Sequence, residues 1–220
     1  MFVHSEAIFR DRVEAGEKLA DKIEELPVVR AAGPEKGIVL GIPRGGPVVA
    51  NQVAKRLGWP QSVVITKKVG APGQEELAVG AMGPDGRVAW NGELLTALGL
   101  SPDDLTIQVA KTEAKIKEYL RKFSLDGMKV EGKTAVVVDD GAATGATMKA
   151  AVRWLKDKNQ VIVALPVCSQ RAAAEIAELA DQFICLHTPE SFMGVGQFYA
   201  DFEPVSDEEV KQILAGGKEF

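Results

Sequence analysis

Several features that would place this 220-residue chain in a specialised class are scarce or missing. Its only two cysteines, Cys168 and Cys185, lie in separate predicted elements without CxxC spacing, which disfavours a disulfide framework and a cysteine metal centre. No apolar run approaches the roughly 20 residues of a membrane span, and the charged N-terminal segment does not resemble a signal peptide. The formal net charge of −5 leaves no basic footprint for nucleic acid. These absences predict a cytoplasmic protein with no membrane or nucleic-acid partner.

What is present fits an ordinary globular protein, with 46% hydrophobic and 26% charged residues. Apolar strand-like runs alternate with segments of helical periodicity, which predicts an α/β fold with a mainly parallel central sheet flanked by helices and a small appendage or hood. We expect a single domain over residues 1–220, with a helical insertion at 99–127 and a C-terminal tail and helix at 188–220. The predicted strands are 37–42, 62–66, 78–82, 87–90, 134–138, 161–167 and 183–186. The predicted helices are 5–26, 47–57, 101–123, 145–156, 170–179 and 207–214.

The segment from Val136 to Thr147, with the sequence VVVDDGAATGAT, carries most of the chemical information. It places Asp139 and Asp140 at the carboxyl end of a buried strand, followed by a loop of small residues that opens a helix. In an open parallel sheet, ligands bind at this edge. The loop amides, the Thr144 hydroxyl and the helix N-terminus favour a phosphate monoester. Because carboxylates repel a phosphate, the two acids are expected to face sugar hydroxyls or a cation.

Two nucleotide-binding motifs do not fit this segment. A Walker loop requires four residues between its glycines and then a lysine, whereas Gly141 and Gly145 are separated by three and Ala146 stands at the lysine position. The GxGxxG spacing of a dinucleotide fingerprint is absent both here and at residues 41–46. The remaining alternative is a structural strand-to-helix turn with two solvated aspartates.

VVVDDGAATGAT resembles the ribose 5-phosphate binding motif of type I phosphoribosyltransferases. GIPRGGPVVA, KKVGAPGQEELAVGA and FYADFEPVSDEEV extend the resemblance to a group of bacterial predicted phosphoribosyltransferases over most of the chain. The resemblance implies that the two acids bind ribose hydroxyls, and that the loop binds the 5-phosphate of 5-phosphoribosyl 1-diphosphate (PRPP). It also implies Mg²⁺ as cofactor, held indirectly by the acids through ribose or water. The residues assigned to PRPP in this way are Asp139, Asp140, Gly141, Ala142, Ala143, Thr144, Gly145, Ala146 and Thr147.

A second glycine-rich turn follows the first predicted strand. In Pro43, Arg44, Gly45 and Gly46, the glycines allow close approach of the backbone to a ligand, and the arginine can contact an anion. The resemblance makes this turn the diphosphate loop, where we expect a backbone conformation that ordinary turns avoid, such as a non-proline cis peptide. The alternative is a plain turn with a solvated arginine.

Lys67, Lys68 and the glycine- and proline-containing segment to Glu76 resemble the mobile lid of the family. We predict a long loop at 70–76, with Lys68 contacting diphosphate when the lid closes. Glu76 is expected to pair with one of the lysines when the lid is open. In this group the sequence is usually Arg-Lys where this chain has Lys67-Lys68, and Asn-Pro where it has Gln74-Glu75. The alternative is a surface loop with solvated lysines.

The segment GVGQFYADF follows the last predicted core strand and is rich in aromatic residues. Phe198, Tyr199 or Phe202 could form a stacking platform for a planar acceptor. Alternatively, these rings pack the C-terminal helix onto the core.

Taken with the resemblance, the sequence predicts transfer of 5-phosphoribosyl from PRPP to a nitrogen acceptor with release of diphosphate, with Arg44 and Lys68 as the catalytic cations. Six-oxopurine enzymes of the family carry an acid at the position of Ala143, so the resemblance disfavours hypoxanthine and guanine. The expected partners are PRPP, a small-molecule acceptor and, as the candidate protein partner, a second copy of the chain. Two rival hypotheses stay open: a PRPP-sensing regulator of the same fold, and a nucleotide hydrolase that uses water as acceptor.

Overall fold

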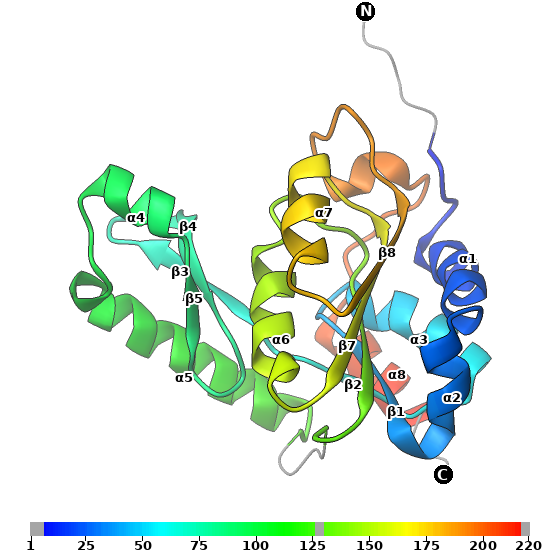
Figure 1. The fold of residues 1–220 in the computed structure, drawn as a ribbon. Helices are drawn as coiled ribbons and strands as arrows, with labels where there is room; N and C mark the ends of the chain where they lie inside the picture. The colour runs from blue at the N-terminus through cyan, green and yellow to red at the C-terminus, as the bar shows by residue number, and fades with distance from the viewer. Residues whose placement is uncertain (1–6, 126–129, 217–220) are drawn as a thin grey trace, which may run out of the picture.

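The structure is a computed structural model that describes residues 7–125 and 130–216. Its core is a five-stranded, fully parallel sheet with the order β2-β1-β6-β7-β8. A second, antiparallel sheet of three strands has the order β3-β4-β5 and stands to one side of the first, beyond α6 (Figure 1). The predicted α/β fold with a mainly parallel, helix-covered sheet is therefore confirmed.

The elements follow one another along the chain with short connections. They are α1 (Arg12–Glu24), α2 (Pro27–Lys36), β1 (Gly37–Gly41), α3 (Gly46–Leu57), β2 (Gln61–Val63), β3 (Lys67–Ala71), β4 (Gln74–Met82), β5 (Val88–Trp90), α4 (Gly92–Leu98), η1 (Pro102–Leu105), α5 (Thr106–Lys122), β6 (Thr134–Val138), α6 (Ala146–Lys156), β7 (Gln160–Val167), α7 (Gln170–Ala177), β8 (Gln182–His187), η2 (Val195–Phe198) and α8 (Asp207–Gly216).

The parallel sheet is buried on both faces, which explains why its strands are continuous apolar runs. In β1, Ile38 and Leu40 face α6 and α7, whereas Val39 faces α1, α2 and α3. In β6, Val137 and Val138 divide between the two faces in the same alternating way. Figure 1 shows these two helical layers on opposite sides of the sheet. The helices cover the two faces of the sheet, and loops follow the carboxyl ends of its strands.

The small sheet packs in a hydrophobic cluster distinct from the two clusters that flank the parallel sheet, although Val63 of β2 and Val210 of α8 also contribute to it. Val69 and Val79 from the hairpin pack with Leu105 and Ile116 from η1 and α5. The expected helical insertion covers the antiparallel sheet. It therefore belongs to a larger unit that runs from β3 to α5, which we call the side module. Residues 126 and 127 of the expected insertion lie outside the described residues.

Some expected bounds were wrong. The first helix begins at Arg12 because the Asp11 side chain accepts a hydrogen bond from the Glu14 amide at 2.8 Å and caps the helix. Phe9 instead forms a parallel bridge with Tyr199. The expected long loop at 70–76 is the hairpin β3–β4 with a tight turn. Helices α2 and α4 were not predicted: α2 is interrupted by Pro34 and by the non-helical backbone of Gly33, and α4 has only seven residues.

Both cysteines are free thiols; Cys168 is buried and Cys185 is partly buried. Burial raises the pKa of Cys168 to about 12 and that of Cys185 to about 11. Within residues 7–125 and 130–216, no helix has the length and apolar character that crossing a membrane requires.

Candidate functional site

The pairing of β1 with β6 brings two predicted loops to the same edge of the sheet. Gly41 and Val138 are opposite each other in register, and the next amide, that of Ile42, donates to the Val138 carbonyl at 2.9 Å. The turn at 42–46 therefore lies beside the acidic pair that follows β6. These segments are about a hundred residues apart in the sequence, and the sheet order places them together.

Glycines make this close approach possible. A β-carbon at position 45 would lie 1.8 Å from Oδ2 of Asp140, and one at position 46 would lie 2.8 Å from the Val138 carbonyl oxygen and 3.1 Å from Oδ1 of Asp139. Neither position has room for a side chain, so Gly45 and Gly46 are required by contact with the acids rather than by φ. The peptide bond between Pro43 and Arg44 is cis, as expected for this turn. Arg44 is exposed, and no carboxylate of the described residues lies within ion-pair distance of it.

The loop after the acids is held against the end of β7. The Ala142 amide donates to the Val167 carbonyl at 3.0 Å, and the Ser169 hydroxyl donates to the Ala143 carbonyl at 2.6 Å. Gly145, with φ of 65°, forms the N-cap of α6 in the left-handed region, where glycine is favoured. The amides of the first turn of α6 have no partner within the helix and point out of its N-terminus. This geometry suits an anion.

The two acids lie in a largely water-excluded position. Burial, followed by the negative charge of Asp140, raises the pKa of Asp139 well above its usual value. Burial also raises the pKa of Asp140, although hydrogen bonding and the charge of Arg12 oppose this. Nε of Arg12 donates to Oδ2 of Asp140 at 2.8 Å. Burial thus disfavours ionisation of both acids, and the hydrogen bond from Arg12 opposes this effect at Asp140.

The aromatic segment at 194–202 packs into the core next to the acidic pair and contacts its backbone. Phe198 and Tyr199 are only 2% and 5% exposed, and they pack with Phe9 in a core cluster. The Tyr199 hydroxyl donates to the backbone carbonyl of Asp140 at 2.6 Å. The Phe202 ring contacts both the Arg12 guanidinium, whose Cζ lies 3.8 Å from the ring centroid, and the Tyr199 ring, whose centroid lies 5.0 Å away. Phe198 and Tyr199 are thus too buried to stack on an acceptor, whereas Phe202 is only partly buried and stays a candidate for stacking. Val210 and Leu214 of α8 pack in a different cluster from these rings.

Comparison with known proteins identifies the family. The model of the phosphoribosyl transferase domain matches residues 10–203. The chain belongs to the phosphoribosyl transferase family. It is 36% identical over 211 residues to two Mycobacterium tuberculosis proteins, "Putative phosphoribosyl transferase Rv0571c" and "Putative phosphoribosyl transferase MT0597". The matched region covers 94% of this chain but 46% of each relative, so the chain spans about half the length of these curated relatives.

A solved structure supports the same assignment. TT1426 from Thermus thermophilus is 37% identical and superposes with a TM-score of 0.76, covering 94% of this chain and 98% of that one. The structural similarity thus extends over nearly the whole chain.

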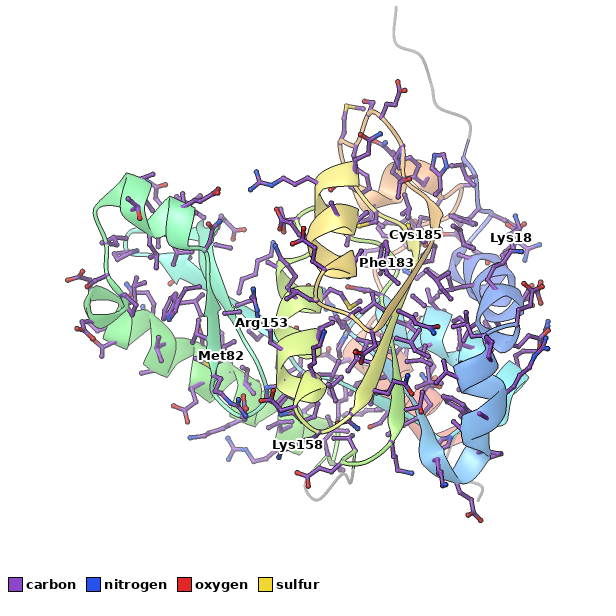
Figure 2. All side chains as sticks on the ribbon, in the orientation of Figure 1. Lys18, Met82, Arg153, Lys158, Phe183 and Cys185 are labelled. Atoms are coloured by element: carbon purple, nitrogen blue, oxygen red, sulfur yellow. The ribbon has the colours of Figure 1, made fainter. Side chains whose placement is uncertain are left out.

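A cleft of about 580 Å³ separates the side module of this phosphoribosyl transferase domain from α6 and α7. Lys68 and Glu76 line it on one side, and Ala143, Thr144 and Lys149 line it on the other. Arg153 also lines the cleft, and Figure 2 shows its side chain between α6 and the small sheet.

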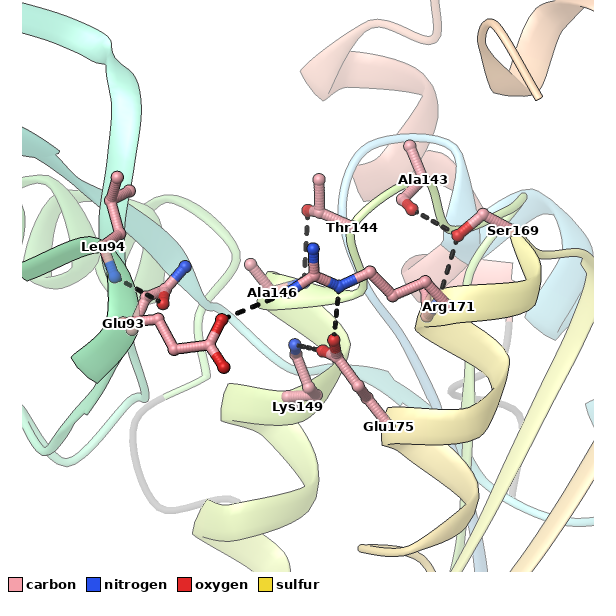
Figure 3. A network of polar contacts seen from close by, with 11 residues as sticks. Glu93, Leu94, Ala143, Thr144, Ala146, Lys149, Ser169, Arg171 and Glu175 are labelled. Atoms are coloured by element: carbon pink, nitrogen blue, oxygen red, sulfur yellow. Dashed lines mark hydrogen bonds and ion pairs between the residues drawn. The ribbon is translucent and has the colours of Figure 1, made fainter. Parts of the chain in front are cut away.

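A network of ion pairs crosses this cleft (Figure 3). Nε of Arg171 donates to Oε1 of Glu175 at 2.8 Å, and Lys149 donates to the other oxygen of that carboxylate. Hydrogen bonds from Lys149 and Arg171 lower the pKa of Glu175. Arg171 also lies 3.8 Å from Glu93 of α4, which belongs to the side module. Two cations are thus held next to the loop at 143–146.

The predicted lid residues fall on opposite faces of β3. Nζ of Lys67 lies 3.7 Å from the centroid of the Tyr119 ring, and burial lowers its pKa. Lys68 is exposed and faces the cleft. The expected pairing of Glu76 with a lid lysine is not found among the described residues; the ion pair from this hairpin joins Glu75 to Lys111 at 3.7 Å.

The sequence did not reveal Arg12 or Ser169, nor the cleft cations Lys149, Arg153 and Arg171. Arg12 lies 128 positions from Asp140, and no motif contains it. Only the fold brings it to the acids.

Proposed function

We propose that this protein transfers the 5-phosphoribosyl group from PRPP to a nitrogen acceptor and releases diphosphate. One observation carries the proposal: the turn at 43–46, the acids Asp139 and Asp140, and the anion-binding loop at 141–147 meet at one edge of the sheet, in contact through Gly45 and Gly46. A phosphorylated sugar with a second anionic group at C1 requires these three kinds of contact next to one another.

Each part of the site has a distinct role in this proposal. The amides at 143–147 and the hydroxyls of Thr144 and Thr147 bind the 5-phosphate, whereas the Ala142 amide already donates to the Val167 carbonyl. The two acids accept hydrogen bonds from ribose hydroxyls and thereby fix C1. Arg44 and the amides of its turn bind the diphosphate, and Lys68 reaches it when the side module closes on the cleft.

Magnesium fits this set of groups as an ion that arrives with the substrate. Mg²⁺ retains several waters and binds through one or two carboxylates together with substrate phosphates. The described residues contain no group of three or more His, Cys, Asp or Glu side chains arranged for a metal. In the proposal, Asp139 and Asp140 bind the ion indirectly, through ribose or water. When bound, the ion would neutralise charge on the departing diphosphate.

The reaction is a displacement at C1. The bond from C1 to the diphosphate oxygen breaks with its electron pair on oxygen, the lone pair of the acceptor nitrogen forms the new bond, and that nitrogen releases a proton. Positive charge develops on the ribose ring during this step. The protein contributes by orientation and by stabilising the leaving group through Arg44 and Lys68.

The test is diphosphate release in the presence of PRPP, Mg²⁺ and a panel of nucleobases and small amines, with a control lacking acceptor. The proposal predicts release that depends on one class of nitrogen acceptor. Release without acceptor would instead show that water is the acceptor, and tight PRPP binding without turnover across the panel would indicate a regulator.

A further inference from the structure

Arg12 makes three contacts at the edge of the candidate site. Its Nε donates to Oδ2 of Asp140 at 2.8 Å, and its Nη1 donates to the backbone carbonyl of Glu203 at 2.8 Å. The guanidinium lies flat enough over Phe202 to bring Cζ within 3.8 Å of the ring centroid. The side chains of Arg12 and Asp140 are only 11% and 15% exposed, so this ion pair differs from the exposed pairs elsewhere on the surface.

The geometry requires arginine in particular. Arg12 uses two nitrogens for acceptors on different segments while its planar face rests on an aromatic ring. A lysine ammonium is a point charge without a planar fork, so it cannot make all three contacts together.

The contacts also fix the direction of the Asp140 carboxylate. Gly45 lies against the same oxygen, and the Tyr199 hydroxyl binds the backbone carbonyl of Asp140. The residue is thus held on its side chain and on its main chain by groups from the N-terminal and C-terminal parts of the described chain. A carboxylate fixed in this way needs no reordering when a sugar hydroxyl arrives.

We propose that Arg12 is a positioning residue for sugar recognition, which holds the Asp140 carboxylate in the orientation that accepts a ribose hydroxyl. The inference rests on the proposed function, because it assumes that Asp140 binds the sugar. It adds a role for the start of α1 and for Phe202, which supports the guanidinium. Arg12 contacts no reacting atom in this account and acts only through Asp140.

The test compares two ligands that differ in their hydroxyls. Ribose 5-phosphate carries the ring, the phosphate and the hydroxyls, whereas tetrahydrofurfuryl phosphate has the ring and the phosphate alone. Calorimetry of wild type, Arg12→Ala and Arg12→Lys with each ligand gives the preference for hydroxyls in each protein. Arg10→Ala serves as the matched control, because Arg10 is exposed and lies two residues away.

The proposal predicts that Arg12→Ala reduces the preference for ribose 5-phosphate by roughly ten- to a hundredfold, the equivalent of one hydrogen bond to a charged group. Binding of tetrahydrofurfuryl phosphate and the behaviour of Arg10→Ala should not change. Arg12→Lys should restore only part of the preference. An unchanged preference in Arg12→Ala, or an equal loss for both ligands, would overturn the proposal, since the second result is that of a purely structural ion pair.

Two further results keep the test decisive. If Arg12→Ala does not fold, Phe202→Leu removes the support of the guanidinium and leaves the ion pair, and it should lower the preference in the same direction by a smaller factor. A normal preference in Phe202→Leu would then count against the proposal. If wild type itself shows no preference for the hydroxyls, the proposed function fails first and this inference falls with it.

Discussion

Gly45 lies so close to Asp140 that a β-carbon at position 45 would stand 1.8 Å from Oδ2 of that carboxylate. The same oxygen accepts the hydrogen bond from Arg12. The glycine turn after β1, the acids after β6 and the start of α1 therefore meet at a single atom. A substitution in one of these segments should therefore displace groups in the other two.

Gly45→Ala should disrupt the site more than a methyl group would elsewhere. The added carbon must displace the Asp140 carboxylate or the turn, and both are needed in the proposed function. We expect at least about a tenfold loss of affinity for ribose 5-phosphate, equivalent to about 1.4 kcal/mol. Gly216→Ala is the matched control, because a β-carbon there meets no atom within 4 Å. Equal affinities for the two variants in calorimetry would show that contact with Gly45 has no functional role.

The two acids should respond oppositely to neutralisation in the ligand-free protein. Because the pKa of Asp139 is raised in the folded state, folding is penalised increasingly as the pH rises from the ordinary pKa of aspartate to the raised one, where the unfolded chain ionises before the folded side chain does. Asp139→Asn removes this penalty and should raise the melting temperature at neutral pH. The gain should vanish as the pH falls towards about 3.9, the ordinary pKa of aspartate, where the wild-type side chain is protonated in both states.

Asp140→Asn should instead lower the melting temperature at neutral pH. It leaves the Arg12 guanidinium largely buried with no carboxylate partner, and an uncompensated buried charge is costly. Thermal unfolding of both single variants measures the contrast. Similar shifts of the same sign would mean that Arg12 does not distinguish the two acids.

Lys67 and Lys68 point to opposite faces because they are consecutive residues of the strand β3. The sequence did not predict a strand here, so it could not assign different roles to the two lysines. Glycine and proline near residues 70–73 suggest a loop, whereas cross-strand pairing turns the segment into a hairpin that places Lys67 over Tyr119 and Lys68 in the cleft. Partners such as Tyr119 come from α5, which is far away in sequence. Local propensity cannot report such contacts.

Lys68→Ala should lower kcat by at least about tenfold and change ground-state binding of PRPP much less, because its contact with diphosphate forms mainly in the closed, reacting complex. Lys67→Ala removes a cation–π contact of roughly 0.5 to 2 kcal/mol and should mainly lower stability. Single-turnover rates with an active acceptor separate the two effects. Equal chemical rates for wild type and Lys68→Ala would make Lys68 an ordinary solvated lysine.

The parts of the site that are contiguous in sequence were the ones that the sequence predicted best. Asp139 to Thr147 could be placed at the edge of the sheet from an apolar strand, two acids and a small-residue loop, because all three are contiguous. The sequence left the role of the aromatic segment open, because Phe198 and Tyr199 are equally compatible with a ligand platform and with a core. Their burial depends on Phe9, which the helical periodicity had assigned to α1. The sequence could not have predicted the place of Arg12 in the site, because its contacts with Asp140, Phe202 and Glu203 are all between residues far apart in the sequence.

The central claim is that Asp139 and Asp140 bind the sugar of PRPP. The most direct measurement is calorimetric titration of PRPP with Mg²⁺ into wild type, Asp139→Asn with Asp140→Asn, and a control with the exposed acids changed as Asp103→Asn with Glu118→Gln. Hydrogen bonds to charged groups contribute roughly 1.5 to 3 kcal/mol each, so the site variant should bind at least about a hundredfold more weakly, and the control should match wild type. An unchanged affinity in the site variant would contradict the account.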